Sequence, residues 1–204
     1  PGDPNQERIN TRLNVHSLGL NDKLETDIAV HYSIDKLRPT NVATNNTGGV
    51  RFLPPNFPLY KDNGDYYWGS STAFYYANPE ASMTRKTESA TNDFLGSALL
   101  SYEVYQGLKV KAAFAYNNQS NEAESIFPSS ASNPYNPVTP NAQSSFSNYT
   151  SMNFEPQLTY NGKISNGVID VLLGSTWFQS KTSGKELELI GFPGDDFMES
   201  WTFA

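Results

Sequence analysis

The sequence alternates apolar and polar side chains in about six segments of roughly ten residues each. Segment 151–160 has the most regular pattern, because every second position is apolar; these positions are Met152, Phe154, Pro156, Leu158 and Tyr160. Side chains alternate sides along a β-strand, so this segment separates an apolar environment from a wet one. Strands of about 9–11 residues with this alternation are long enough to cross the hydrocarbon core of an outer membrane. Pro156 lacks an N–H group, which predicts a bulge or an unpaired edge beside it.

The connections between these segments alternate between short and long. Strands are predicted at 9–18, 25–34, 92–104, 108–118, 151–160 and 168–180. Residues rich in Gly, Asn and Asp predict short turns at 19–23, at 105–107 and from 161. Long irregular connections are predicted at 35–90, at 119–147 and from 181. All short turns thus fall at one end, which predicts an all-β antiparallel up-and-down meander forming part of a transmembrane β-barrel with long extracellular loops.

The aromatic residues of the predicted strands concentrate near the strand ends. Tyr102, Tyr105 and Tyr160 lie near the short turns. The rings predicted near the long loops are Tyr32, Phe114, Tyr116, Trp177 and Phe178. Amphipathic rings prefer the interface between membrane and water, so the sequence predicts two aromatic girdles.

The bulk composition excludes several classes of protein. The chain has 204 residues, a net charge of −7, 37% hydrophobic and 13% aromatic residues, and no cysteine. An acidic chain is a poor partner for nucleic acid, because phosphate binding needs clustered Lys and Arg. The absence of cysteine argues against a small disulfide-stapled domain, and no apolar run is long enough for a transmembrane helix. The first residues do not form a signal peptide, and we expect an internal piece of a longer protein.

The best candidate for a ligand site is an aromatic run in the first long connection. Flat rings stack on the apolar faces of sugars, and loops often carry function. The alternative is that these rings pack against other loops or against a partner protein. The candidate ligand-binding residues are Tyr66, Tyr67, Trp68, Tyr75 and Tyr76.

Other polar groups give weaker signals. Segment 62–65 resembles the start of a calcium loop but lacks the later Glu in register, so a turn is predicted. His16 and His31 fall on the polar faces of neighbouring strands, and Asp27 is the only evident third ligand. Polar residues facing a barrel lumen explain them better, so no metal site is predicted. No nucleophile elbow or phosphate-binding glycine loop occurs, so no catalytic residue and no cofactor are predicted.

Several motifs in order resemble one family. They are the segment LPPNFPLYKDNG at 53–64, the pair Asn78-Pro79, the strand GSALLSYEV at 96–104 with Gly107-Leu108 after its turn, and GFPGDD at 191–196. Together they span nearly the whole chain, which resembles the SusC/RagA-type TonB-dependent transporters of Bacteroidetes outer membranes. The energy-coupling box and the N-terminal plug domain of that family do not occur in these residues.

The resemblance implies a role in transport and not in catalysis. Residues 1–204 would form a partial β-barrel domain of a plugged barrel of about 22 strands in the cell outer membrane. The parent protein would import a glycan or peptide, powered by the TonB complex and lidded by a SusD-like surface lipoprotein. Its further partners would be outer-membrane lipid and a second transporter pair, with no nucleic acid.

Two other functions fit parts of the pattern. A secreted soluble β-sandwich that binds carbohydrate would use the same alternating strands and loop aromatics. Its apolar face would meet a second sheet instead of lipid. A secreted polysaccharide-cleaving enzyme would need a carboxylate pair across a cleft, and the sequence offers no candidate for it.

Overall fold

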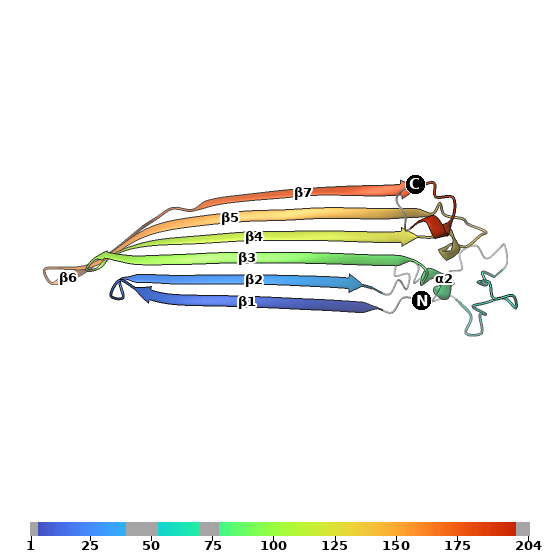
Figure 1. Ribbon diagram of the computed structural model, residues 1–204, viewed down its shortest axis with the longest axis horizontal. Helices are drawn as coiled ribbons and strands as arrows, with labels where there is room; N and C mark the ends of the chain where they lie inside the picture. Colours follow the sequence, from blue (N-terminus) through green and yellow to red (C-terminus); the bar gives the residue numbers. More distant parts are fainter. Residues whose placement is uncertain (1–3, 40–52, 70–77, 199–204) are drawn as a thin grey trace.

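A single antiparallel sheet dominates the computed structural model, which describes residues 4–39, 53–69 and 78–198 (Figure 1). Its strands are β1 (Asn5–Gly19), β2 (Leu24–Arg38), β3 (Lys86–Tyr105), β4 (Leu108–Phe127), β5 (Asn141–Ile164), β6 (Gly167–Gly174) and β7 (Trp177–Ile190). The strands neighbour one another in sequence order from β1 to β6, and β7 pairs with β5. The predicted all-β meander is therefore confirmed.

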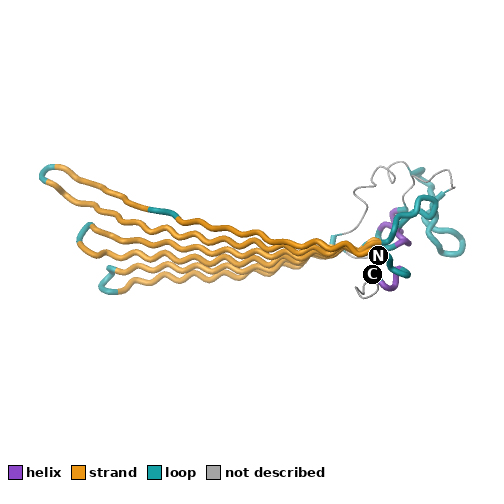
Figure 2. The backbone as a smooth tube through the Cα atoms, turned by 90° about the horizontal axis from the view of Figure 1, so that it is seen from above, coloured by secondary structure: helices purple, strands orange, loops and turns teal. Residues whose placement is uncertain are grey.

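The connections are sorted by length as the sequence predicts. The short turns lie at one end of the sheet, whereas the long loops and the short helices lie at the other (Figures 1 and 2). These helices are α2 (Pro79–Ser82), η2 (Ser129–Ala131) and η3 (Asp195–Phe197). The turn between β1 and β2 places three consecutive residues, Leu20, Asn21 and Asp22, at φ angles of 54°, 57° and 63°. Asn and Asp tolerate this left-handed conformation better than other residues with a Cβ atom, which fits their use here.

The strands are longer than predicted toward the loop end. β4 continues to Phe127 and β5 begins at Asn141, so much of the predicted loop 119–147 is strand. The segment after 181, predicted as a loop, is most of β7. In these outer parts polar residues occupy both faces, so the alternation that identifies a membrane-crossing strand disappears although the backbone pairing continues.

The third short turn also differs from the prediction. β5 continues through Asn161 and Gly162 to Ile164, and the turn consists of Ser165 and Asn166. Ser165 has a φ of 55°. Asn-Gly is a strong turn signal, but here the pairing of β5 with β6 extends past it and overrides the local preference.

The predicted sixth strand is divided in two beside Pro156. Pairing of β5 with β6 ends at Gln157 and Gly174, and pairing with β7 begins at Phe154 and Trp177. The N–H of Ser175 donates to the carbonyl of Pro156 at 3.1 Å, so the backbone edge of Pro156 faces this break. Because Pro156 has no N–H to return the hydrogen bond, the ladder is interrupted, and the predicted defect is confirmed.

The buried apolar side chains lie at the loop end of the sheet. A small cluster of Ala142, Phe192 and Met198, flanked by Ile126 and Leu189, lies where β4, β5 and β7 end. Among the described residues no second sheet covers either face of the first, which gives the β-sandwich alternative no support. Within the same residues, none of the helices has the length and apolar character to span a membrane.

Candidate functional site

One face of the sheet carries a continuous apolar band. Residues that pair directly across an antiparallel sheet share a face, so the register places Val15, Ile28, Ala98, Phe114 and Phe154 in one row. On β4 the same face carries Leu108, Val110, Ala112, Phe114 and Tyr116. Many of these side chains are exposed in this single layer.

The band has the height of a membrane core. From Leu108 to Tyr116 the strand rises about 27 Å at about 3.4 Å per residue. A strand tilt of about 45° reduces this length to a height of about 20 Å, close to the roughly 25 Å apolar band of outer-membrane barrels. Beyond Tyr116 the same face becomes polar and then acidic, with Asn118, Ser120, Glu122 and Glu124. The apolar surface therefore ends partway along the strands.

Aromatic rings lie at both limits of this band. Tyr32 pairs with Phe94 toward the loop end, and the ring of Phe94 lies 6.1 Å from that of Tyr116. Tyr102 and Tyr160 mark the other limit, beside the short turns. Of the predicted girdle residues, Tyr32, Tyr116, Tyr102 and Tyr160 lie at these limits, whereas Phe114 lies within the band.

Trp177 and Phe178 lie on opposite faces of β7. The Trp177 ring stacks on Phe154 at 5.7 Å between centroids, on the apolar face. Phe178 pairs with Asn153 and therefore lies on the polar face. Its predicted place in the girdle is wrong, because two adjacent strand residues cannot both lie on the apolar face.

The opposite face of the sheet is polar and hollowed. A hollow of about 420 Å³ crosses the sheet from β1 to β5, and its lining includes Asn14, His16, Asp27, Asn153 and Glu155. These residues alternate with those of the apolar band along each strand. In a closed barrel this arrangement would put lipid on one side of the wall and a wet lumen on the other.

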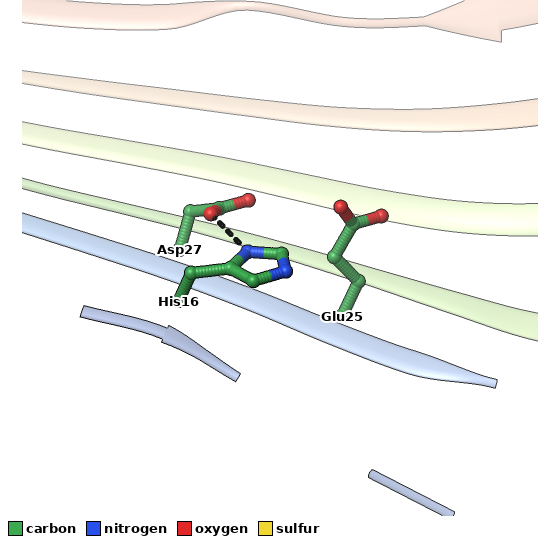
Figure 3. A group of neighbouring side chains, drawn as sticks. All are labelled: His16, Glu25 and Asp27. Atoms are coloured by element: carbon green, nitrogen blue, oxygen red, sulfur yellow. Dashed lines mark hydrogen bonds and ion pairs between the residues drawn. The ribbon is translucent and has the colours of Figure 1, made fainter. Parts of the chain in front are cut away.

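A histidine and two carboxylates meet on this polar face. His16 on β1 pairs directly with Asp27 on β2, and its Nδ1 lies 2.6 Å from Asp27 Oδ1 (Figure 3). Glu25 lies two residues from Asp27 on the same face, and one ligand atom from each of the three side chains falls within 4.8 Å of the others. Glu25 could not be placed in this group from the sequence, because its position beside His16 depends on the register of the hairpin.

His16 and His31 lie on one face, as the sequence predicts, but they are not direct neighbours. His31 pairs with Arg12, four residues along β2 from Asp27, and does not belong to this group. The two histidines share a face but occupy different rows of the sheet. The register therefore groups His16 with carboxylates and not with His31.

The described part of the aromatic run lies in a small hairpin near α2. Tyr60 and Tyr66 form a β-bridge, with ring centroids 5.7 Å apart, and Phe57 lies 5.2 Å from Tyr67. Tyr66 and Tyr67 are partly exposed, whereas Trp68 is only 7% exposed. The remaining candidates, Tyr75 and Tyr76, lie outside the described residues.

The tip of this hairpin is a turn, as the sequence predicts for segment 62–65. Gly64 N donates to the Lys61 carbonyl at 2.9 Å, and Lys61 N donates to the Asp65 carbonyl at 2.8 Å. Gly64 has a φ of +87°, a conformation that glycine adopts without strain. Asp65 N donates to Asn63 Oδ1 at 3.2 Å, so this side chain shapes the turn.

Asn78 holds the aromatic hairpin against α2. Its side chain is fully buried, and Nδ2 donates to the carbonyls of Leu59 and Tyr67 at 2.6 and 2.9 Å. Its Oδ1 accepts hydrogen bonds from the N–H groups of Glu80 and Ala81, which caps the helix, and Pro79 fits the first helical position. The pair Asn78-Pro79 therefore connects a helix start to the loop that carries the aromatic residues.

Asp195 connects two loops at the same end of the sheet. Its Oδ1 accepts hydrogen bonds from the backbone N–H and the hydroxyl of Ser129 at 2.8 Å each, and its Oδ2 accepts one from Ser130 N at 2.9 Å. Partial burial raises the pKa of Asp195, but these hydrogen bonds to the ionised form lower it more, so the pKa lies below its ordinary value of 3.8. The loop after β4 and the loop after β7 are thereby joined.

The lowered pKa makes this link dependent on pH. A carboxylate with a lower pKa in the folded state than in the unfolded state stabilises the fold at any pH above its unfolded pKa of 3.8. This stabilisation is lost as the pH falls through the pKa of the folded state. We expect Asp195→Asn to lower the thermal unfolding midpoint at pH 7, with the difference from the wild-type protein shrinking below pH 3.8. Melting curves of both proteins from pH 7 downward measure this difference, and a constant difference would contradict the assigned role.

Comparisons with known proteins find the same fold. No family model and no curated protein matches the chain. A solved structure described as the RagAB peptide transporter superposes with a TM-score of 0.70 at 19% identity, covering 96% of this chain and 22% of the other. The RagAB peptide importer in its "closed-closed" and "open-open" states gives TM-scores of 0.69 and 0.67, each at 20% identity with the same coverage.

This chain has the fold of a RagAB transporter segment. The RagAB structures are β-barrel transporters, which agrees with the predicted partial barrel. The chain spans only 22% of the length of the RagAB chains that it matches, so it corresponds to a small part of such a protein. The likeness extends over both the strands and the loop end, because it covers 96% of this chain.

Proposed function

We propose that this chain forms part of the wall and outer loops of an outer-membrane importer for peptides or glycans. The apolar band carries this proposal, because it is limited in height, bordered by aromatic rings and backed by a hollow polar face. Such a surface suits a sheet between lipid and a wet lumen. The likeness to RagAB transporters supports the same role.

The partners of such an importer would bind at opposite ends of the wall. The long loops and helices lie at one end, where a SusD-like surface lipoprotein would cover the barrel (Figure 1). A plug domain outside these residues would contact the TonB complex. The neighbouring structures are described as peptide importers, which favours peptide cargo over glycan for this chain.

The function is tested by fractionating cells that make the full-length parent protein and isolating its complex from outer membranes. Recovery in the outer membrane with a surface lipoprotein and bound peptide or glycan is expected. Recovery as a lone protein in the secreted soluble fraction would overturn the proposal. Mass spectrometry of material released from the complex would separate peptide cargo from glycan cargo.

We further propose that the rings of the aromatic run, Tyr66, Tyr67, Trp68, Tyr75 and Tyr76, serve cargo binding. Tyr66 is the best target, because it is partly exposed and its ring lies against that of Tyr60. Trp68 is buried and would support the loop rather than contact cargo directly. A partly exposed aromatic ring such as that of Tyr66 can stack on sugars or on peptide side chains.

Tyr66→Ala is expected to weaken cargo binding by about fivefold to tenfold, the effect of losing one aromatic contact of about 1 kcal/mol. Titration of the purified transporter complex with its cargo measures this affinity. Tyr135→Ala is the matched control, because Tyr135 is an exposed ring in a different loop, 51% exposed. Equal affinities for Tyr66→Ala and the wild-type protein would contradict the assignment.

A further inference from the structure

The geometry points to a divalent transition-metal site formed by His16, Glu25 and Asp27 on the polar face, near the short-turn end of β1 and β2 (Figure 3). The three side chains project from the same face of one hairpin into the wet side of the wall. This site is independent of the cargo that the transporter carries.

The hairpin register sets the spacing of these ligands. His16 and Asp27 face each other directly, and Glu25 is the diagonal neighbour of His16 two residues along β2. Direct and diagonal neighbours on one face are the pairs that can touch across an antiparallel sheet. One ligand atom from each residue already lies within 4.8 Å of the others.

Small side-chain rotations would complete the coordination. Metal–ligand bonds of about 2.0–2.2 Å require ligand atoms roughly 3–4 Å apart. The side chains of His16 and Asp27 are 53% and 44% exposed, so solvent and not packing surrounds much of them and leaves them free to turn. On β3, the residues opposite Asp27 and Glu25 are Leu99 and Ser101, which are uncharged. Glu103, two residues beyond Ser101 on the same face of β3, is negatively charged, so no cation at these positions of β3 competes for the two carboxylates.

The ligand set selects the type of ion. Two carboxylates neutralise a divalent cation, and an imidazole nitrogen favours zinc and its neighbours over magnesium and calcium, which prefer oxygen ligands alone. Three protein ligands leave at least one position open to water from the lumen side. A bound ion would also link β1 to β2 beside the turn whose residues Leu20, Asn21 and Asp22 adopt left-handed conformations.

The test is a calorimetric titration of the metal-stripped, full-length parent protein in detergent with Zn²⁺. We expect the His16→Gln variant to bind one Zn²⁺ fewer than the wild-type protein. In the Glu25→Gln variant the affinity of that site for Zn²⁺ should fall at least about tenfold. His31→Gln is the matched control, because His31 lies on the same face of β2 but outside the group, and it should bind Zn²⁺ as the wild-type protein does.

Binding of Co²⁺ supplies a second measurement. Its absorption band would not change if His16 only stabilised the fold and did not bind the metal. The visible absorption of bound Co²⁺ depends on its ligands, so the wild-type and His31→Gln proteins should share a band that His16→Gln lacks. Circular dichroism of each variant verifies that the barrel remains folded. Absence of Zn²⁺ uptake by the wild-type protein, or identical titrations of His16→Gln, Glu25→Gln and the wild-type protein, would overturn the proposal.

Discussion

Arginine in place of Ala112 is expected to destabilise the folded barrel by about 2–4 kcal/mol. Ala112 occupies the central position of the apolar face of β4, midway between Leu108 and Tyr116. In a membrane this position lies near the bilayer midplane, where an arginine side chain must either lose its hydration or distort the lipid around it. The free energy of unfolding of the full-length parent protein, measured by denaturant titration in lipid vesicles, gives this cost.

Ala113→Arg is the matched control for Ala112→Arg. Both variants change alanine to arginine at almost the same depth, but adjacent strand residues point to opposite faces. Ala113 lines the polar hollow and pairs directly with Glu155, so an arginine there remains hydrated and gains a nearby carboxylate. Equal destabilisation by the two variants would contradict the assignment of the apolar face to lipid.

The strand segments that carry the apolar band could be predicted from the sequence, whereas their extensions toward the loop end could not. On β4 the residues from Leu108 to Tyr116 alternate between an apolar face and a polar face, and this alternation is visible in the sequence. From Gln119 to Phe127 most residues on both faces are polar, so the residue types no longer alternate although β4 still pairs with β3 and β5. Backbone N–H and C=O groups pair across a sheet whatever the side chains are. The sequence pattern therefore does not reveal these extensions of the strands.

The candidate metal group depends on the register of one hairpin and not on any local motif. His16 and Asp27 could be placed on one face from their periodicity alone, but so could His31. The turn at 20–23 decides which of them become neighbours, because it fixes every pair from Leu24 onward. Had the turn been centred one residue away, each pair along the hairpin would have changed. Glu25 therefore became a candidate only once the register was known.

Alanine in place of Gly107 is expected to destabilise the sheet by about 2–5 kcal/mol, from backbone strain together with overpacking. Gly107 lies in the turn between β3 and β4 with a φ of +83°, a conformation unfavourable for residues with a Cβ atom. A Cβ atom there would lie only 2.1 Å from the backbone oxygen of Asn161. Asn161 N also donates to the Gly107 carbonyl at 2.8 Å, so the turn cannot retreat without breaking a hydrogen bond to β5.

Gly191→Ala separates the two causes of this cost. Gly191 follows β7 with a φ of +88°, but among the described residues no atom beyond its chain neighbours lies within 4 Å of the position that its Cβ would occupy. It should therefore cost only the left-handed strain of about 1–2 kcal/mol. Denaturant titration of both variants in lipid vesicles gives the difference, which measures the contact between the β3–β4 turn and β5. If Gly107→Ala costs no more than Gly191→Ala, that turn is not packed against Asn161, and the close approach of the turn to β5 is wrong.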